Sequence, residues 1–408
     1  MSVVSGKKIV LGISGGIAAY KTASLVRLFI KAGAHVQVIM TPASKDFITP
    51  LTLSTLSKNP VYSSFYNEEE ESSQNAQWNN HVELGLWADL ILIAPATANT
   101  MSKMATGNCD NLLIATYLSA KCPVYFAPAM DLDMYKHPTT VASFEALTSF
   151  GNIMIPAESG ELASGLSGEG RMAEPENILA FIERDLSAKL PLRNKTILIT
   201  AGPTYEAIDP VRFIGNHSSG KMGFDIAHEA AKQGARVILI SGPTHYTVQD
   251  AAITLVRVTS AQEMYEACHQ YFETVDVAIC AAAVADYRPK EVATQKIKKA
   301  DTDMVIALEK TTDILASLGA AKKNQFLIGF ALETENEIEN AKQKIQKKNL
   351  DLIVLNSLQD EGAGFATATN KITFIDCNYT VEPMPLKSKE LVAADIINKV
   401  IVHYEKNS

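Results

Sequence analysis

The sequence predicts an α/β protein that contains two doubly wound, mainly parallel sheets. Two observations predict this fold class: short, continuously apolar segments alternate with helical segments, and the same strand–helix–strand layout occurs twice. A buried strand, a helix and a second buried strand form the unit of a parallel sheet that is covered on both faces. A chain of 408 residues has room for two such domains.

The first strand–helix–strand unit lies at the N-terminus. The segment KKIVLGIS (residues 7–14) is rich in β-branched residues and continuously apolar, which is typical of a buried parallel strand. Residues 15–33 predict a helix that ends at Gly33. Its apolar face carries Ile17, Leu25, Leu28 and Phe29. A second strand, AHVQVIMT, follows directly.

The same layout recurs from residue 195. A strand (KTILIT), a helix (GKMGFDIAHEAAKQG) and a strand (ARVILISG) follow one another, and the polar stretch 188–194 precedes them. We therefore expect one domain over residues 1–189 and a second over 190–408. In Rossmann-like sheets of this kind, ligands bind at the carboxyl ends of the strands. Residues directly after each strand are the candidates for chemistry.

Charge and cysteine content restrict the partners and the compartment. The net charge of −8 argues against nucleic acid as a partner, because phosphate binding needs a basic face. The 5 cysteines are scattered without a C-x-x-C spacing, which favours reduced thiols over a disulfide framework or a zinc site. No apolar run approaches the about 18 residues of a membrane span. We expect a soluble cytoplasmic protein.

The first turn combines glycine and serine at the end of a strand. It reads Gly12-Ile13-Ser14-Gly15-Gly16, and glycines at such a turn let a phosphate approach the backbone. The turn does not match G-x-G-x-x-G, and Thr41, not an acid, ends the second strand, which disfavours a dinucleotide. Taken alone, the turn is equally compatible with a tight connection that binds nothing.

Several motifs together carry a resemblance in the first domain. HVELGLWAD (81–89), APATANT (94–100), DNLL (110–113) and PAM (128–130) follow the glycine turn in this order. This combination resembles the FMN-dependent cysteine decarboxylases. The resemblance implies that His81 is the active-site histidine. It implies that FMN is held by Ser14, Gly15, Gly16, Thr41, Thr97 and Asn99.

Two catalytic positions depart from that family. Asp131 stands where the family has an asparagine that binds the substrate carboxylate, and Ser164 stands where it has a proton-donating cysteine. Two carboxylates about 4 Å apart repel by roughly 4 kcal/mol at an effective dielectric near 20. Asp131 must therefore be protonated, turned away or paired with a cation if the site decarboxylates. A serine hydroxyl is also a much weaker acid than a thiol.

The segment ESGELASGLSGEGRM (158–172), which contains Ser164, has three possible roles: a linker, a phosphate cradle or a lid. Because the domain boundary falls later, a linker is disfavoured. The retained glycines and Arg171 favour a lid over the flavin site, with Arg171 anchoring its end.

The second domain contains GNHSSGK (215–221), which fits the G-x-x-x-x-G-K pattern of a P-loop. We reject that interpretation because Met222 occupies the Ser/Thr position and no regular strand immediately precedes the glycine. The stretch AGPTYEAIDPVRFIGNHSSGKMG, together with AAAVADY (281–287), resembles the phosphopantothenate–cysteine ligases. The resemblance implies that Asn216 is the catalytic asparagine. It implies that the nucleotide is bound by Ala282, Asp286, Lys296, Lys310, Asp313, Phe330, Lys344 and Lys348.

Together the resemblances cover almost the whole chain and imply the fused bifunctional bacterial enzymes of coenzyme A biosynthesis. The expected reactions are CTP-dependent ligation of 4′-phosphopantothenate with cysteine, with Mg²⁺ bound alongside CTP, and FMN-dependent decarboxylation of the product to 4′-phosphopantetheine. The sequence leaves ATP open as the nucleotide. The resemblance also implies a homo-oligomer, with trimeric flavin domains and dimeric ligase domains in an assembly as large as a dodecamer.

Three alternatives remain beside this function. The first is a ligase whose flavin half is slow or inactive, because Asp131 and Ser164 depart from the family. The second is a flavin-binding regulatory protein without catalytic activity. The third, an NAD(P) dehydrogenase, is disfavoured because neither half has the dinucleotide fingerprint.

Overall fold

The computed structural model describes residues 2–66, 78–162, 164–299, 304–333, 335–357 and 369–406. The chain divides into two compact units, Met1–Ala188 and Lys189–Ser408. Both units are α/β, as the sequence predicts, and the prediction of the fold class is confirmed.

A six-stranded parallel sheet forms the centre of the first unit, with the strand order β3-β2-β1-β4-β5-β6. Its two long central strands are almost entirely buried, which explains their continuous apolar sequence. In chain order the strands are β1 (Lys8–Ile13), β2 (His35–Met40), β3 (Val61–Tyr62), β4 (Leu90–Ala96), β5 (Val124–Pro128) and β6 (Ile153–Met154).

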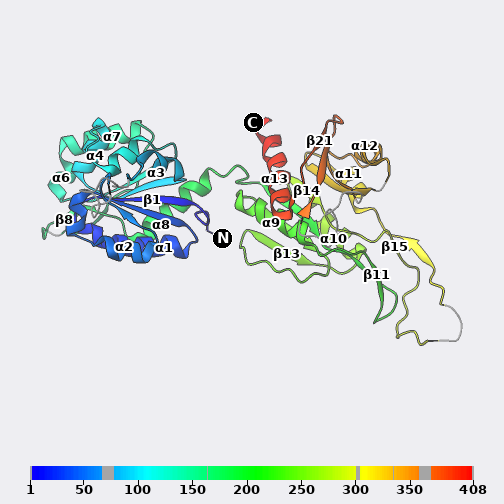
Figure 1. Cartoon of the computed structure of the whole chain (residues 1–408). Helices are drawn as coiled ribbons and strands as arrows, with labels where there is room; N and C mark the ends of the chain where they lie inside the picture. The colour runs from blue at the N-terminus through cyan, green and yellow to red at the C-terminus, as the bar shows by residue number, and fades with distance from the viewer. Residues whose placement is uncertain are drawn as a thin grey trace. The chain divides into compact units, whose positions relative to one another are not determined.

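Helices cover both faces of this sheet (Figure 1). Alternate residues of β1 enter different cores: Ile9 packs with α1, α2 and α8, and Val10 packs with α4, α5 and α7. The helical segments of the unit are η1 (Ile17–Lys21), α1 (Thr22–Lys31), η2 (Pro42–Asp46), α2 (Pro50–Ser57), α3 (His81–Trp87), α4 (Ala98–Thr106), α5 (Leu112–Leu118), α6 (Leu132–Lys136), α7 (Pro138–Ser149) and α8 (Pro175–Ala188).

The predicted start of the first helix is wrong. Residues Ile17–Lys21 form the 3₁₀ segment η1, and the α-helix begins at Thr22. Ile17 therefore does not share the buried face of Leu25 and Phe29: its side chain is 61% exposed, and it lines the cavity described below. The tighter 3₁₀ winding rotates Ile17 away from the positions that the 3.6-residue period assigns.

An eight-stranded sheet forms the centre of the second unit, with the order β13-β12-β9-β14-β17-β18-β20-β21. The first six strands in this order are parallel. At one edge, β20 pairs antiparallel with β18, and β21 pairs antiparallel with β20. The strands are β9 (Thr196–Ala201), β12 (Arg236–Ser241), β13 (Ile253–Arg257), β14 (Val277–Cys280), β17 (Phe326–Glu333), β18 (Leu352–Ser357), β20 (Ile372–Asp376) and β21 (Val381–Pro383).

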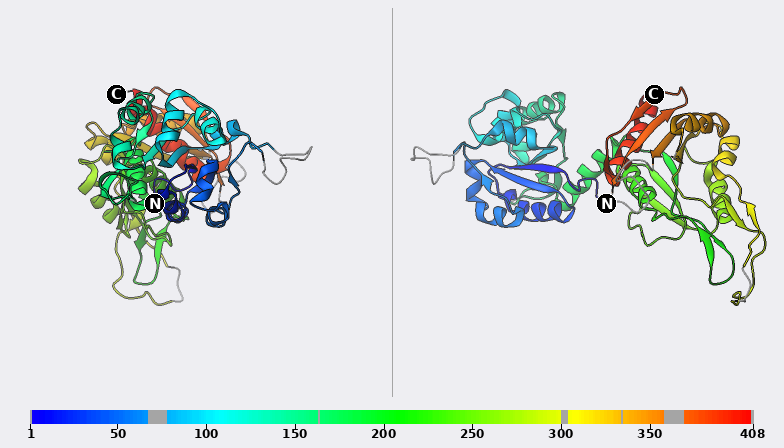
Figure 2. Two further views of the ribbon diagram at one scale, coloured as in Figure 1. Left: turned by 90° about the vertical axis from the view of Figure 1, so that its left-hand side faces the viewer. Right: turned by 45° about the vertical axis from the view of Figure 1, so that its right-hand side comes forward.

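Helices again cover both faces of the second sheet. Figures 1 and 2 show α9 and the red C-terminal helix α13 side by side, and both pack in one core with Ile197. The opposite core combines Leu198 with α10, α11 and α12. The helices are α9 (Lys221–Lys232), α10 (Ala261–Phe272), α11 (Ile314–Ala321), α12 (Glu337–Lys347) and α13 (Lys389–Lys406).

Small antiparallel ribbons complete both units, and one of them corrects the sequence analysis. A short strand, β11, immediately precedes and includes Gly215, contrary to our expectation that none does. It belongs to a two-stranded ribbon with β10 and not to the central sheet, so the P-loop interpretation still lacks its strand. The ribbon strands are β7 (Glu158–Glu161), β8 (Ser167–Arg171), β10 (Tyr205–Ala207), β11 (Phe213–Gly215), β15 (Tyr287–Pro289), β16 (Leu308–Lys310), β19 (Thr369–Asn370) and β22 (Lys387–Ser388).

None of the helices within the described ranges combines the length and the apolar character that are needed to cross a bilayer.

Gly319 in α11 gives a test of this packing. A Cβ atom added at Gly319 would lie 1.9 Å from the backbone oxygen of Lys348, which cannot rotate away as a side chain could. Overpacking costs about 1–3 kcal/mol, and the helix propensity of alanine returns at most about 1 kcal/mol. We expect Gly319→Ala to lower the free energy of unfolding by about 1–2 kcal/mol, measured by calorimetry of the whole chain.

The matched control is Ala320→Gln, at the exposed neighbouring position of the same helix. It should change the free energy of unfolding by less than about 0.5 kcal/mol. A Gly319→Ala protein as stable as the Ala320→Gln protein would contradict the packing described here.

Candidate functional sites

A cavity of about 980 Å³ opens at the carboxyl ends of β1, β2, β4 and β5 in the first unit. Parallel strands place the loops that follow them at one edge of the sheet, so motifs far apart in the sequence meet there. The lining includes the glycine turn, the residues after β2, the ATANT loop, and residues that follow β5. Among the predicted residues, those that line it are Gly15, Gly16, Thr41, Thr97, Asn99 and Asp131.

Ser14 joins two of these loops. Its Oγ donates a hydrogen bond of 2.6 Å to the backbone oxygen of Pro95 and accepts one of 3.0 Å from the backbone N–H of Thr97. The hydroxyls of Ser14 and Thr97 also lie 3.1 Å apart. Ser14 thus holds the glycine turn against the ATANT loop, and the two strand ends form one surface.

The same surface has room and an unsatisfied polar atom for a ligand. A Cβ atom at Gly15 would lie 2.9 Å from the Ala43 Cβ, so glycine permits the turn to approach the loop after β2 closely. The Oγ1 atom of Thr41 is buried without a hydrogen-bond partner in the described part of the chain. A buried hydroxyl without a partner is costly unless a ligand satisfies it. These residues therefore fit a polar, phosphate-bearing cofactor such as FMN.

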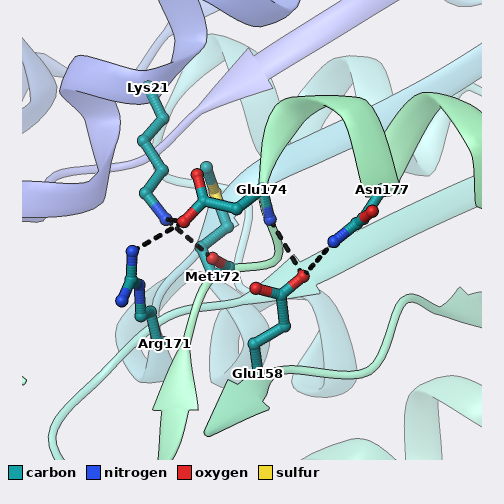
Figure 3. A network of polar contacts seen from close by, with 6 residues as sticks. All are labelled: Lys21, Glu158, Arg171, Met172, Glu174 and Asn177. Carbon is teal, nitrogen blue, oxygen red and sulfur yellow. Dashed lines mark hydrogen bonds and ion pairs between the residues drawn. The ribbon is translucent and has the colours of Figure 1, made fainter. Parts of the chain in front are cut away.

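The segment 158–172 begins and ends in the antiparallel hairpin β7–β8, which lies along this cavity. Its base is fixed by a polar network (Figure 3). Glu174 accepts hydrogen bonds from Lys21 (2.9 Å) and Arg171 (2.7 Å), and Lys21 also donates to the backbone oxygen of Met172 (3.0 Å). Glu158 accepts from the backbone N–H of Glu174 at 3.2 Å. The Lys21 side chain is only 6% exposed, and its ammonium donates to two acceptors, a carboxylate and a backbone oxygen.

The hydrogen bond from Lys21 lowers the pKa of Glu174 below its ordinary value, against the opposing effect of burial. The carboxylate therefore stays ionised at neutral pH and holds the two cations together. Arg171, expected to anchor the end of the lid, forms one arm of this network.

Two predicted catalytic residues, Ser164 and His81, are not among the residues of this chain that line the flavin cavity. Ser164 is exposed in the turn of the hairpin, where the backbone N–H of Gly165 donates to the oxygen of Leu162 at 2.9 Å. His81 begins α3 and packs edge-on against Phe65 and Trp78, with ring centroids 6.1 and 5.6 Å away. The His81 Nδ1 atom is buried and has no hydrogen-bond partner among the described residues.

A second cavity, of about 410 Å³, lies in the second unit at the ends of β9, β14 and β17. Thr200 of β9 accepts a hydrogen bond of 3.1 Å from the backbone N–H of Ala282, which follows β14. The predicted nucleotide-binding residues that line this cavity are Ala282, Asp286, Lys310, Asp313, Phe330 and Lys348.

Lys348 and Asp313 form an ion pair of 2.9 Å in the wall of this cavity. Asp313 also caps the N-terminus of α11, where its carboxylate accepts a hydrogen bond of 3.0 Å from the backbone N–H of Ala316. Burial alone would raise the pKa of Asp313, but the hydrogen bond from Lys348 and the helix cap bring it below the ordinary value. Burial raises the pKa of Cys280, which also lines the cavity, to about 12, so this thiol adds no charge.

The predicted catalytic asparagine lies beside this cavity. Asn216 Nδ2 donates to the backbone oxygens of Ala283 (3.2 Å) and Val284 (2.9 Å), and Val284 lines the cavity. Two other predicted residues lie elsewhere. Lys344 pairs with Glu333 at 2.5 Å, Lys296 is exposed, and neither lines the cavity.

Two buried charged residues that hold segments near these sites were not predicted from the sequence. Lys21 is the buried cation at the base of the lid hairpin, and its only signal is a charge directly before the apolar helix α1. Asp209 is the other: its buried carboxylate accepts hydrogen bonds from Arg212 and from the backbone N–H of Ile297 (3.1 Å). Asp209 thereby connects the β10–β11 ribbon to the segment that carries Lys296.

Within the described ranges, no group of three or more His, Cys, Asp and Glu side chains is arranged to hold a metal ion.

Two family profiles divide the chain between them. The Flavoprotein family matches residues 2–187, and the DNA/pantothenate metabolism flavoprotein C-terminal domain matches residues 192–403. The chain is 42% identical over 400 residues to the coenzyme A biosynthesis bifunctional protein CoaBC of Bacillus subtilis, covering 98% of this chain and 97% of that protein. It is 41% identical to the protein of that name from Escherichia coli, with 99% of each chain covered.

A relative with a different name is also similar. The chain is 53% identical over 359 residues to a cysteine/cysteine sulfinic acid decarboxylase from an unknown prokaryotic organism, covering 87% of this chain and 99% of that protein.

Solved structures match each half separately. The crystal structure of the C-terminal domain of a CoaBC protein is 45% identical, with a TM-score of 0.46, and covers 53% of this chain and 100% of that chain. A PPC decarboxylase mutant complexed with pantothenoylaminoethenethiol is 34% identical, with a TM-score of 0.39, and covers 44% of this chain and 98% of that chain.

Glu174 gives a test of how the lid hairpin is held. A folded-state pKa below the unfolded value of 4.5 means that the stabilisation is complete above that value and is lost as the pH falls through the folded-state pKa. At pH 7 we expect Glu174→Gln to speed hydrogen exchange of the hairpin amides roughly fivefold, because the two cations lose their carboxylate.

Glu176→Gln, at an exposed acid in the first turn of α8, is the matched control and should leave the exchange rates unchanged. Equal exchange rates in the Glu174→Gln and natural proteins would show that the network does not hold the hairpin.

Proposed function

Because this chain belongs to the family of the coenzyme A biosynthesis bifunctional proteins CoaBC, we propose that it catalyses two consecutive steps of that pathway. The second unit joins 4′-phosphopantothenate to cysteine at the expense of CTP. The first unit removes CO₂ from the resulting 4′-phosphopantothenoylcysteine and forms 4′-phosphopantetheine.

One observation carries this proposal: the flavin motifs and the nucleotide motifs line two separate cavities, one in each unit. The described residues that line each cavity come from one unit. The two reactions therefore have separate sites, which agrees with two family profiles that match the two halves.

The ligase half must turn a carboxylate into a group that an amine can displace. Attack of the 4′-phosphopantothenate carboxylate on CTP releases pyrophosphate and gives an acyl-cytidylate, and the cysteine nitrogen then displaces CMP. Lys310 and Lys348 are the cavity cations suited to the triphosphate, with Mg²⁺ bound to the nucleotide. Asn216, held against the cavity wall, is placed to donate to the acyl intermediate.

The flavin half must stabilise the electron pair that CO₂ leaves behind. FMN, when bound, supplies a hydride acceptor that turns the thiol-bearing carbon into an electron sink. Ser14, Gly15, Gly16, Thr41, Thr97 and Asn99 are the residues that would hold it. We propose that His81 and Ser164 act on the substrate, and that Asp131, at the position of the family's carboxylate-binding asparagine, influences which substrate the site accepts. Trimeric flavin domains and dimeric ligase domains are part of the same proposal.

Similarity over both halves favours this two-step function over a chain with one active half and over a flavin-binding regulatory protein. A second candidate activity of the flavin half is the decarboxylation of free cysteine. The observation that favours it is the 53% identity to the cysteine/cysteine sulfinic acid decarboxylase, whose match covers most of both units.

Lys348 separates the two activities. Replacing Lys348 by glutamine removes the cation that Asp313 holds in the nucleotide cavity. Losing one charge-assisted contact should lower the rate of pyrophosphate release from CTP, 4′-phosphopantothenate and cysteine about 10- to 100-fold. CO₂ release from added 4′-phosphopantothenoylcysteine should not change.

The matched control is Lys347→Gln, at the exposed preceding position, which should leave both activities unchanged. If the natural protein fails to release pyrophosphate from the three substrates, or fails to release CO₂ from phosphopantothenoylcysteine, the proposed two-step function is wrong. Replacing CTP by ATP in the same assay identifies the nucleotide.

Thr41 tests the flavin site without an activity assay. Thr41→Val keeps the shape of the side chain and removes the buried hydroxyl that has no partner among the described residues. If that hydroxyl bonds FMN, the dissociation constant for FMN should rise about 2- to 10-fold, measured by flavin fluorescence during titration. Thr55→Val, at an exposed position of α2, is the control, and equal affinities of the two variants would count against Thr41 as a ligand.

A further inference from the structure

Asp131 has a carboxylate that the protein itself does not use. It lies directly before α6, where an aspartate commonly caps the helix, but its side chain accepts no capping hydrogen bond. The backbone oxygen of Asp131 accepts a hydrogen bond of 2.9 Å from Tyr135, but its carboxylate makes no hydrogen bond or ion pair with any described residue. Its side chain lines the flavin cavity. A partly buried carboxylate in this state is available to a ligand.

The cations that line the same cavity are already paired with other acids. Lys21 and Arg171 both bind Glu174, and Lys103 binds Asp110 at 2.5 Å. The hydrogen bond from Lys103 lowers the pKa of Asp110, so this second pair is also ionised at neutral pH. The charge that neutralises Asp131 must therefore come from the ligand or from solvent.

The backbone on either side of Asp131 is fixed by the lid hairpin. The backbone N–H of Met130 donates to the oxygen of Gly170 at 2.9 Å. A Cβ atom at Gly170 would lie 2.4 Å from the Met130 oxygen, and one at Gly168 would lie 2.6 Å from the side chain of Leu132. Strand β8 thus packs closely against both neighbours of Asp131 and holds this part of the backbone in place.

The charge of Asp131 distinguishes two classes of substrate. An ionised carboxylate accepts hydrogen bonds and donates none, so it repels a substrate carboxylate and attracts an ammonium. In phosphopantothenoylcysteine the cysteine nitrogen is a neutral amide. In free cysteine it is an ammonium ion at neutral pH, close enough to the reacting carboxylate for one cavity to hold both groups.

We propose that Asp131 is a specificity-determining residue that binds the α-ammonium group of free cysteine and so lets the flavin half decarboxylate the unacylated amino acid. The inference rests on the proposed function, since it assumes that this half decarboxylates cysteine carboxylates. Loss of CO₂ breaks the bond between Cα and the carboxylate carbon, and a proton from solvent takes the electron pair on Cα. Cysteine becomes 2-aminoethanethiol with no net oxidation.

The test compares Asp131→Asn with the natural protein on both substrates. The measured quantity is kcat/KM for CO₂ release from cysteine and from phosphopantothenoylcysteine. Removing a charge-assisted contact should lower kcat/KM for cysteine at least about tenfold, while the value for the acylated substrate stays equal or rises. Asp133→Asn removes the same charge two residues away at an exposed position and should change neither value.

A binding measurement accompanies the rates. Titration of the flavin-loaded protein with 2-aminoethanethiol and with N-acetyl-2-aminoethanethiol, followed by flavin absorbance, compares a cation with its neutral amide. The natural protein and Asp131→Glu should prefer the cation, and Asp131→Asn should lose this preference. If the role of Asp131 were purely structural, Asp131→Asn would weaken the binding of both ligands equally.

The outcomes separate this inference from the proposed function. Release of CO₂ from phosphopantothenoylcysteine but not from cysteine by the natural protein would overturn the inference and leave the proposed function intact. An equal loss of both activities in Asp131→Asn would also overturn it. Release from cysteine alone would support the role of Asp131 and refute the two-step function.

Discussion

The burial of both faces of each parallel sheet is the constraint on which the sites depend. Strands such as β4, buried along their whole length, must be covered by helices on both sides, because their side chains point alternately to each face. Ligands are then left with the ends of the sheet. The loops after β1, β2, β4 and β5 meet there in one unit, and those after β9, β14 and β17 meet in the other.

The pairing of buried charges is the second constraint, and the two cavities pair their lysines in different ways. Lys21 is almost completely buried, so its ammonium needs partners, and Glu174 and the Met172 oxygen supply them. This requirement ties the first helical segment to the base of the lid hairpin. In the second unit Lys348 stands in the cavity wall with Asp313, and the polyphosphate of a nucleotide would compete with that carboxylate for the same ammonium.

The sequence predicted the residues whose position follows from the ends of strands. Ser14 and Thr97 directly follow β1 and β4, so the topology alone brings them within a hydrogen bond of each other. The position of Ile17 was predicted wrongly because a helical period does not reveal a 3₁₀ turn. The short strand that ends at Gly215 was missed because it has too few residues to show a pattern. Such elements depend on tertiary contacts more than on local propensity.

Long side chains are also difficult to place from the sequence, because their direction depends on tertiary contacts. Lys344 and Lys348 share a helical spacing, which suggested that both converge on phosphate. Lys344 instead bonds Glu333, whereas Lys348 reaches the cavity. Spacing places two residues on one face of a helix, but the acids on neighbouring elements decide where each ammonium points. Those neighbours are separated from the lysines in sequence and give no local signal.

The two departures of the flavin half lie at different places: Ser164 is in the turn of the lid hairpin, and Asp131 lies outside the hairpin, beside strand β8. Ser164 is exposed at the turn, where its hydroxyl matters only when the hairpin brings it to the substrate. Asp131 lies between Met130 and Leu132, and both of these neighbours pack against β8. Under the roles proposed for these two residues, a change at the turn alters what the hairpin delivers to a bound substrate, and a change at Asp131 alters which substrate the cavity binds.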